Sequence, residues 1–316
     1  MEKVSAIIIH EHGAAEKVAR YERVELVPPG PGEVRVRMLV APIHPADINV
    51  LEGKYPVRPA LPGVPGVEGV GVIEKSGQRV LLPYRFGSWR EAGNAKEADL
   101  IAVPDGISDE QAAMLRINPA TALLMLRDFV KLEPGEWVVQ NLASSAVGRC
   151  VIRIARHFGW RTVNVVRRAE VAEELKAEGA DEVIVEGGDI SAAVNGAPIR
   201  LALNAVGGDS AVRLASVLAP GGTIVTYGAM ARQPLRIPNG LLIFQDTAWR
   251  GFWVTRWYER ATAAERAAVF AELFELVKSG VVSTPVEAVY PLAEITTALE
   301  HAQRSGRGGK VMLRGT

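Results

Sequence analysis

Strands and helices alternate through the second half of this chain, and the alternation restricts the folds open to it. Short strand-like runs stand at 137–139, 161–166, 182–185, 201–204 and 223–227. Between the first two runs, apolar residues recur at helical spacing from Val147 to Phe158 and stop at Gly159. Strand–helix–strand units of this length form right-handed crossovers, so their strands build a parallel sheet with helices on both faces. The pattern predicts a doubly wound, Rossmann-type nucleotide-binding domain.

The first part of the chain has a different pattern. Residues 34–40 alternate apolar and charged side chains, which is typical of a half-buried strand, and residues 66–73 form a second strand-like run interrupted by glycines. After Trp253 the sequence predicts an amphipathic helix over 262–279, a short helix over 293–303 and a strand over 310–313. We therefore expect an α/β protein with two domains. The β-rich domain would comprise residues 1–118 and 256–316, and the nucleotide-binding domain residues 119–255.

Composition excludes several function classes. The 36 Lys and Arg residues balance 36 Asp and Glu residues, so the overall charge favours neither nucleic acid nor an anionic membrane as a partner. The single cysteine, Cys150, excludes an internal disulfide and a multi-cysteine metal site. No window approaches the roughly 18 apolar residues of a membrane span, and the first residues resemble neither a signal peptide nor a mitochondrial presequence. These features predict a cytoplasmic protein.

The turn after strand 137–139 is the first candidate for cofactor binding. A Rossmann sheet binds pyrophosphate at this place with glycines and a helix N-terminus. Here Ser144, Ser145 and Ala146 precede a lone glycine, Gly148. An ordinary strand–helix turn accounts for these residues about as well as a phosphate site does.

The end of strand 161–166 carries more information. NAD-binding domains usually place an acidic residue there to bind the ribose hydroxyls. This chain instead has Arg167 and Arg168. Guanidinium groups pair in bidentate fashion with phosphate, so the pair favours the 2′-phosphate of NADP over the alternative of two solvated arginines that begin a helix.

Eight short stretches carry a resemblance to a known family. They are PADIN at 45–49, GKY at 53–55, INPATA at 117–122, NVVR at 164–167, LNAVGG at 203–208, YGAM at 227–230, LIFQD at 242–246 and RGFW at 250–253. In this order they resemble the zinc-independent members of the medium-chain dehydrogenase/reductase superfamily. More narrowly they resemble the mitochondrial-type trans-2-enoyl thioester (enoyl-CoA/ACP) reductases, which are close to quinone oxidoreductases. The resemblance implies a GroES-like catalytic domain, NADPH as cofactor, an acyl thioester or quinone as substrate, and a homodimer.

The resemblance also assigns site residues. It makes Tyr55 the catalytic acid, which suits a phenol that stays protonated at neutral pH and can donate to a developing oxyanion. Without the resemblance, a tyrosine packed in a proline-flanked loop would be the better reading. The implied cofactor contacts are Asn118, Ser144, Ser145, Ala146, Val147, Arg167, Arg168, Tyr227, Gly228, Ala229, Met230, Phe252, Trp253, Val254 and Lys310. Ala146 and Ala229 replace glycines of the family pattern, and Ala169 replaces its arginine.

A catalytic metal is not expected. Zinc-dependent relatives carry a ligand shortly before an aspartate and then Gly-His-Glu. Here His44 precedes Asp47, but Gly66-Val67-Glu68 lacks the histidine. A single histidine is more often a hydrogen-bonded loop residue than a ligand.

The sequence thus favours an NADPH-dependent reductase of activated carbon–carbon double bonds, with enoyl thioesters as substrates. A quinone oxidoreductase and a non-catalytic NADPH-binding or sensing protein are the alternatives. A nucleic-acid-binding regulator is disfavoured by the balanced charge.

Overall fold

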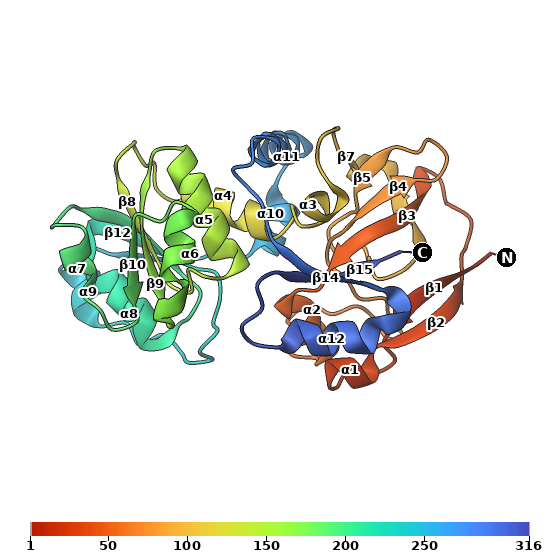
Figure 1. Ribbon diagram of the computed structural model, residues 1–316, viewed down its shortest axis with the longest axis horizontal. Coiled ribbons are helices and arrows are strands. Elements are labelled where there is room, and N and C mark those ends of the chain that lie inside the picture. The colour runs from red at the N-terminus through yellow and green to blue at the C-terminus, as the bar shows by residue number, and fades with distance from the viewer. Residues whose placement is uncertain (1, 316) are drawn as a thin grey trace. The chain divides into compact units, whose positions relative to one another are not determined.

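The computed structural model describes residues 2–315, which form two compact units (Figure 1). The first unit contains residues 2–117 and 283–315, and the second unit contains residues 118–282. The expected return to the first unit at residue 256 therefore differs from the observed one at 283. Helix α11 (Ala263–Lys278) packs against α4 (Asn118–Asp128) within the second unit, where Arg127 forms an ion pair with Glu272 at 3.1 Å. The sequence shows the apolar face of α11 but not the helix that covers it.

A six-stranded parallel sheet forms the centre of the second unit. Its order is β10 (Glu182–Val185), β9 (Arg161–Val166), β8 (Trp137–Gln140), β11 (Ile199–Asn204), β12 (Leu218–Thr226) and β13 (Ala248–Gly251). This is the strand order of the dinucleotide-binding fold. Strands β9 and β10 are added on one side of β8 and strands β11 to β13 on the other, so the strand order reverses between β8 and β11. Ligands of such sheets bind outside the carboxyl ends of the strands at that reversal. The predicted Rossmann domain is confirmed.

Helices cover both faces of this sheet, as Figure 1 shows in green and cyan. The core on one face includes residues of α5 (Ala146–His157) and α6 (Ala172–Ala177), and the other face packs α7 (Ile190–Ala193), α8 (Gly208–Ser216) and α9 (Asn239–Ile243). A 3-10 turn at Ala169–Val171 precedes α6, and α10 (Val254–Arg260) follows β13. The buried positions of α5, such as Val151, Ile154 and Ala155, are those whose helical spacing the sequence displays.

The first unit is built from both ends of the chain. Its main sheet runs β14 (Val286–Pro291), β15 (Lys310–Arg314), β3 (Glu33–Pro42), β4 (Val70–Ile73), β5 (Arg79–Leu81) and β7 (Ile101–Ala102), with β6 (Ala92–Lys96) paired to β3. Strand β15, from the chain's end, is antiparallel to β3 and places Met312 opposite Pro42. The short helices of this unit are α1 (Ala15–Val18), α2 (Pro45–Leu51), α3 (Asp109–Ala113) and α12 (Ile295–Gln303).

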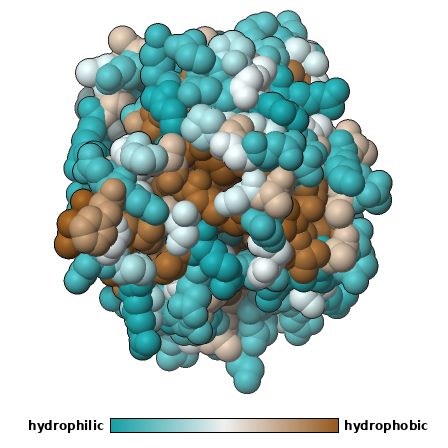
Figure 2. Space-filling model, turned by 90° about the vertical axis from the view of Figure 1, so that its left-hand side faces the viewer, coloured by the Kyte–Doolittle hydropathy of each residue, from teal (hydrophilic) through white to brown (hydrophobic). Residues whose placement is uncertain are grey.

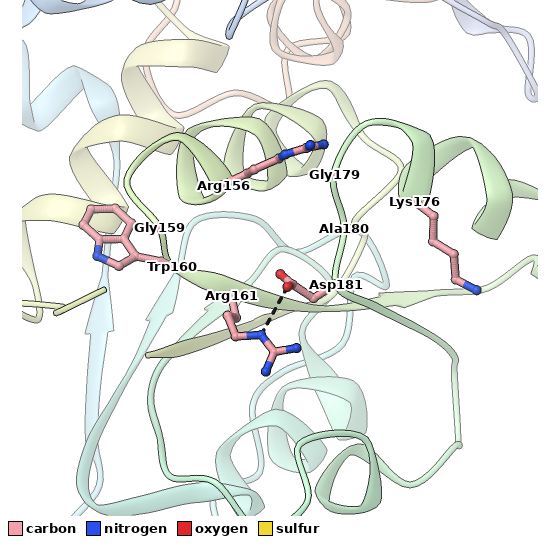
Figure 3. Close-up of a pocket in the computed structure, with 8 residues that line it drawn as sticks. All are labelled: Arg156, Gly159, Trp160, Arg161, Lys176, Gly179, Ala180 and Asp181. Carbon is pink, nitrogen blue, oxygen red and sulfur yellow. Dashed lines mark hydrogen bonds and ion pairs between the residues drawn. The ribbon is translucent and has the colours of Figure 1, made fainter. Parts of the chain in front are cut away.

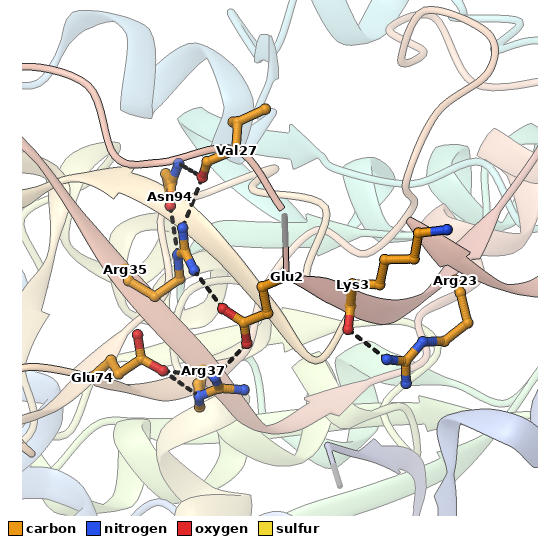
Figure 4. Close-up of polar contacts among 8 residues, drawn as sticks. All are labelled: Glu2, Lys3, Arg23, Val27, Arg35, Arg37, Glu74 and Asn94. Carbon is orange, nitrogen blue, oxygen red and sulfur yellow. Dashed lines mark hydrogen bonds and ion pairs between the residues drawn. The ribbon is translucent and has the colours of Figure 1, made fainter. Parts of the chain in front are cut away.

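An N-terminal hairpin of β1 (Lys3–Ile8) and β2 (Arg20–Glu25) is tied to the main sheet by ion pairs (Figure 4). Glu2 accepts from Arg35 at 3.1 Å and from Arg37 at 2.8 Å, and Arg37 also reaches Glu74. Glu2, Arg37 and Glu74 are exposed and Arg35 is mostly buried, and exposed pairs contribute about 0–1 kcal/mol each. These ion pairs therefore fix the position of the N-terminal strand on the main sheet more than they add stability.

The glycine-interrupted run at 66–73 becomes a strand only over Val70–Ile73. Gly66 has a φ of +105°, and a Cβ added to it would lie 2.5 Å from Ser88 Oγ. The backbone therefore turns at Gly66 and carries Glu68 into the interior before the strand begins. In the part of the chain that the structure describes, no helix is long and apolar enough to cross a membrane.

Candidate active site

Buried amides fix the carboxyl ends of the parallel strands in the second unit. Asn141, directly after β8, donates through Nδ2 to Asn204 Oδ1 at 2.9 Å and to Ser210 Oγ at 3.0 Å. Its Oδ1 accepts from the Ala205 amide at 2.7 Å, and Asn204 Nδ2 donates to Thr226 Oγ1 at 3.1 Å. These bonds join the ends of β8, β11 and β12 at the reversal of strand order, where this fold binds ligands.

A second amide pair lies on the other side of β8. Gln140 Nε2 donates to Asn164 Oδ1 at 2.7 Å and to the Gly148 carbonyl at 2.9 Å. Asn164 is fully buried in β9 and donates to Thr162 Oγ1 at 2.8 Å. The family motifs do not point to these two hydrogen-bond networks. The sequence signal for them is the presence of polar amides in otherwise apolar strands.

The turn between β8 and α5 has the geometry of a ligand cradle. Leu142 adopts a φ of +53°, and Ser145 caps α5 by accepting from the Gly148 amide at 3.1 Å. A Cβ on Gly148 would lie 2.4 Å from the Ala143 carbonyl oxygen, so only glycine fits there. The N-terminus of this 12-residue helix therefore sits close against the turn, with Ser144, Ser145, Ala146 and Val147 half-buried around it.

Arg167 and Arg168 lie where the sequence predicts, at the carboxyl end of β9, and both are exposed. Arg167 forms no ion pair with any of the described residues. Arg168 contributes a little to lowering the pKa of Glu174, which Arg149 mainly holds down. A guanidinium left in solvent at this strand end fits a phosphate group.

The remaining predicted residues of the second unit gather at the same edge of the sheet. The Tyr227 amide donates to the Asn204 carbonyl, the Met230 amide to the Ala205 carbonyl and the Phe252 amide to the Thr226 carbonyl, each at 2.9 Å. Gly228 packs against the same loop, since its Cβ would meet the Ala205 carbonyl at 2.9 Å. Ala229 and Met230 are exposed, Phe252 and Trp253 half-buried, and Val254 buried.

One buried polar atom at a predicted cofactor contact lacks a hydrogen-bond partner among the described residues, Nδ2 of Asn118. The buried hydroxyl of Tyr227 faces Ser145; burial raises the pKa of Tyr227, and a hydrogen bond with Ser145 acts in the opposite direction. An unsatisfied buried donor is costly, and a carboxamide or ribose hydroxyl would satisfy Asn118 and add a partner to Tyr227. Together with the Gly148 cradle and the two arginines, they fit NADP.

A hollow of about 390 Å³ in the second unit lies at the amino ends of β9 and β10, away from the carboxyl ends where the predicted cofactor residues gather (Figure 3). Arg156, Arg161 and Lys176 line it together with Asp181, which pairs with Arg161 at 3.2 Å. The hollow lies beside the C-termini of α5 and α6, whose carbonyls favour cations. Its arginines therefore complement helix ends, and the hollow is separate from the cofactor residues.

Tyr55 belongs to the first unit and lies in the turn after α2. Its amide donates to the Asn49 carbonyl at 3.1 Å, and the side chain is half-buried. Arg85 has its guanidinium carbon 5.7 Å from the centre of the Tyr55 ring and donates to the Val57 carbonyl at 2.6 Å. Arg85 therefore braces the loop that carries the tyrosine, at the cost of a φ of +63°.

Ionisable side chains meet at the other end of α2. His44 Nε2 lies 2.5 Å from Glu68 Oε1, and His44 Nδ1 lies 2.9 Å from Lys310 Nζ. The His44 amide donates to Asp47 Oδ2 at 2.9 Å, and the Ile117 amide donates to Glu68 Oε2 at 3.1 Å. His44, Asp47 and Glu68 are 2%, 1% and 0% exposed. We refer to His44, Asp47, Glu68 and Lys310 as the ionisable cluster.

Burial is the main cause of the shifted pKa values in the ionisable cluster. It raises the pKa of Asp47 to about 7 and that of Glu68 to about 8, and the Lys310 ammonium opposes both shifts. Burial and the Lys310 charge together hold the pKa of His44 well below its ordinary value. His44 is therefore a neutral imidazole at neutral pH.

These residues do not fit a zinc ion. One ring nitrogen of His44 faces a carboxylate, and the other faces an ammonium group, which would repel a second cation. Val67 supplies no ligand, and no cluster of three or more suitable side chains occurs in residues 2–315. The expectation that His44 is a hydrogen-bonded residue agrees with this geometry.

Comparison with family models gives two matches. The alcohol dehydrogenase GroES-like domain model matches residues 30–105, and the zinc-binding dehydrogenase model matches residues 178–313. With the sheet order described above, they define the class of protein, a medium-chain dehydrogenase/reductase. That part of the sequence-based resemblance is confirmed.

Relatives narrow the class. Enoyl-[acyl-carrier-protein] reductase, mitochondrial, from Homo sapiens is 38% identical over 98% of this chain and 88% of its own length. The Caenorhabditis elegans protein of the same name is 45% identical over 80% of this chain and 78% of its own length. The chain belongs to the family of these mitochondrial enoyl-[acyl-carrier-protein] reductases.

Solved structures agree with this placement. An Etr1p complex with NADP and crotonyl-CoA superposes with a TM-score of 0.89 at 27% identity and covers 99% of this chain and 100% of that one. A Bacillus thuringiensis protein assigned as an NADPH:quinone reductase superposes with a TM-score of 0.92 at 28% identity and covers both chains fully.

One sequence-based prediction is wrong. The predicted cytoplasmic location is contradicted by the relatives, because the matching proteins from several organisms are named as mitochondrial. Balanced charge and the lack of a recognisable targeting pattern do not determine a compartment.

Proposed function

We propose that this chain is an NADPH-dependent reductase of trans-2-enoyl thioesters, with the second unit binding the cofactor and the first unit supplying Tyr55. The observation that carries the proposal is the 38–45% identity to enoyl-[acyl-carrier-protein] reductases over 80–98% of the chain, which spans both units. The TM-score of 0.89 to the Etr1p structure with NADP and crotonyl-CoA supports the same substrate class.

The second unit's residues divide the cofactor among them in this proposal. The turn of Ser144, Ser145, Ala146 and Val147 would hold the pyrophosphate, and Arg167 with Arg168 the 2′-phosphate. Asn118, through its unsatisfied Nδ2, and Tyr227 would donate to the nicotinamide side. Gly228, Ala229, Met230, Phe252, Trp253 and Val254 would flank the ring, and Lys310 of the first unit would contact the cofactor.

When bound, NADPH supplies the hydride that goes to the β-carbon of the enoyl thioester. Negative charge then develops on the thioester carbonyl oxygen until a proton reaches the α-carbon. A protonated phenol at Tyr55 would stabilise that oxygen by donating a hydrogen bond. Arg85 and Arg58, which donate to the carbonyls of Val57 and Gly53, keep the Tyr55 loop in place.

The test of Tyr55 is the Tyr55→Phe variant, with Tyr84→Phe as matched control because Tyr84 also faces Arg85. Turnover is followed as NADPH oxidation with crotonyl-CoA, and again with a quinone. Loss of one oxyanion donor lowers kcat by about a hundredfold or more, so Tyr55→Phe should show that loss and Tyr84→Phe should not. Equal turnover of wild type and Tyr55→Phe on crotonyl-CoA would remove the tyrosine from the mechanism. Turnover on quinones alone would favour a quinone reductase.

Arg167→Gln and Arg168→Gln test the cofactor assignment. Each should raise KM for NADPH by about tenfold while changing KM for NADH little, since only NADPH carries the 2′-phosphate. Arg156→Gln, in the hollow at the amino ends of β9 and β10, is the control. An equal effect on both cofactors would contradict 2′-phosphate binding.

We also propose that the chain forms a homodimer through the outer edge of β13. In the described residues β13 pairs only with β12, so one side of it is open. Beside it are exposed apolar side chains, with Leu242, Ile243 and Phe244 exposed by 43%, 69% and 85%. Figure 2 shows hydrophobic residues gathered on a face of the second unit. An open strand edge with apolar neighbours fits a second copy, and a related mitochondrial 2-enoyl thioester reductase from Candida tropicalis is described as an Etr1p/Etr2p heterodimer.

Sedimentation equilibrium tests the dimer. Wild type should sediment as a dimer and Phe244→Glu as a monomer, because a carboxylate at the apolar face would lose its water on association. Val27→Glu, at a residue of the first unit exposed by 60%, is the control. A monomeric wild type at micromolar concentration would contradict the proposal.

A further inference from the structure

The hydrogen bonds of the ionisable cluster determine where its protons lie. An ammonium group has donors only, so His44 Nδ1 accepts from Lys310 Nζ at 2.9 Å. The neutral imidazole then carries its hydrogen on Nε2 and donates it to Glu68 Oε1 at 2.5 Å. The three side chains form one directed chain of hydrogen bonds from Lys310 to Glu68.

The far end of this chain is fixed as well. Glu68 Oε2 accepts from the Ile117 amide at 3.1 Å, so both oxygens of this fully buried carboxylate face donors. His44 and the Ile117 amide face its two oxygens as donors, an arrangement that favours the ionised form and opposes the burial that raises the pKa of Glu68. The charged groups around it are Lys310, Asp47 and Arg116, and the two cations offset the burial that raises its pKa. Glu68 is therefore the counter-charge of the Lys310 ammonium, and the neutral imidazole of His44 connects the two by hydrogen bonds.

We propose that His44 and Glu68 are positioning residues that hold the Lys310 ammonium group in place for an anionic part of the dinucleotide. This inference rests on the proposed function, which assigns Lys310 to the cofactor. A free lysine side chain loses rotamer entropy when it is ordered, and ordering it before the ligand arrives removes that cost from binding. The polar groups that orient a ligand-binding side chain typically change affinity about tenfold or more when they are removed.

Glu68→Gln is the informative substitution because it changes which atoms donate in the hydrogen bonds of His44. If the amide oxygen keeps the Ile117 hydrogen bond, the amide nitrogen faces His44 and donates to Nε2. The imidazole must then carry its hydrogen on Nδ1, where it meets the ammonium donors of Lys310. Lys310 then loses the hydrogen bond to His44 Nδ1. It also loses the electrostatic attraction of the Glu68 charge.

Two measurements on the full chain test the proposal. The first is the tautomer of His44 in the free protein, read from ¹⁵N shifts of histidine-labelled samples and assigned with a His44→Asn spectrum. The second is the Kd for NADPH from fluorescence titration of wild type, Glu68→Gln, Lys310→Met and the double variant. Asp47→Asn is the matched control, since it neutralises a neighbouring buried carboxylate that bonds the His44 amide and not the ring.

We expect the Nε2–H tautomer in wild type and in Asp47→Asn, and the Nδ1–H tautomer in Glu68→Gln. Glu68→Gln and Lys310→Met should each raise the Kd for NADPH by about tenfold, and the double variant should bind no more weakly than Lys310→Met. An Nδ1–H tautomer in wild type overturns the proposal and requires no variant to fold. An unchanged Kd in Glu68→Gln, or additive losses in the double variant, also overturns it. A wild-type chain that binds NADPH but reduces no enoyl thioester contradicts the proposed function alone.

Discussion

The two units differ in the kind of polar group that they bury. The second unit places neutral amides, Gln140, Asn141, Asn164 and Asn204, at the carboxyl ends of its parallel strands, and all four are 0% exposed. The first unit buries ionisable groups at the start of α2, where the carboxyl groups of Asp47 and Glu68 lie near the Lys310 ammonium. Amides hold the strand ends at any pH, whereas the ionisable cluster depends on its protons. We therefore expect the geometry of the second unit to be independent of pH and the stability of the first unit to depend on it.

The largest effect is expected for Asp47→Asn. Burial raises the pKa of Asp47 to about 7 from an ordinary 3.8, so the folded state holds a proton that the unfolded state releases. Stability is then highest below the unfolded pKa and falls as pH rises through the folded one, by up to about 4 kcal/mol. Asparagine should remove this share of the slope. Urea unfolding at about pH 5 and about pH 8, read by hydrogen-exchange pulses on peptides of each unit, measures it. An unchanged slope in the first unit would contradict the prediction.

Asn141→Asp should give the second unit the pH dependence that it lacks. The substitution removes the donors to Asn204 and Ser210 and buries an acid, which costs about 3 kcal/mol at neutral pH and less when the acid is protonated. Asn204→Asp is the control, because Asn204 Oδ1 already accepts from Asn141 and from the amides of Val206 and Gly207. This variant loses the donor to Thr226 Oγ1, but the threonine hydroxyl can donate to the new carboxylate, so it should cost less than Asn141→Asp. The same unfolding experiment compares them, and equal losses would count against the amide network.

Gly148→Ala should destabilise the second unit by about 2 kcal/mol at every pH, because its Cβ would lie 2.4 Å from the Ala143 carbonyl oxygen. The control is Gly240→Ala, whose Cβ would meet only the Phe244 ring at 3.7 Å. Since the Gly148 turn is the proposed pyrophosphate site, the Kd for NADPH should rise in the same variant. A pH-dependent loss would show that charge, not packing, determines this turn.

The smallest effect is expected at two helix caps, one in each unit. Ser145 Oγ accepts from the Gly148 amide at 3.1 Å, and Ser108 Oγ accepts from the Gln111 amide at 3.3 Å. Replacing either serine by alanine should cost about 1 kcal/mol, independent of pH, because hydroxyl caps carry no charge. Thermal unfolding of both variants at two pH values checks this. A pH-dependent difference between them would show that the ionisable cluster influences helices elsewhere in the first unit.

Much of the fold could be predicted because its signals are local. Strand β9 occupies residues 161–166 as expected, and α5 falls within one residue of its apolar period. The point where the chain returns to the first unit could not be placed from sequence, since the apolar face of α11 is compatible with any apolar partner. Its packing on α4 depends on residues more than 100 positions earlier in the chain.

The candidate site divides in the same way. Arg167 and Arg168 follow directly from their place after a strand, and Tyr55 follows from family motifs. The comparison with zinc-dependent relatives draws attention to His44, Asp47 and Glu68, but no motif connects them with Lys310, which is 266 residues from His44. No spacing rule connects such positions. Only the pairing of β15 with β3 brings Lys310 to His44.

That pairing has a consequence for how the chain folds as it is made. The second unit is complete in residues 118–282, whereas the sheet of the first unit gains β15 only from residues 310–314, which are synthesised after the whole second unit. His44, Asp47 and Glu68 are synthesised long before Lys310. Burying the two carboxyl groups without the ammonium group would remove their water and supply no counter-charge. The N-terminal segment should therefore stay unfolded on the ribosome until the nucleotide-binding unit has folded.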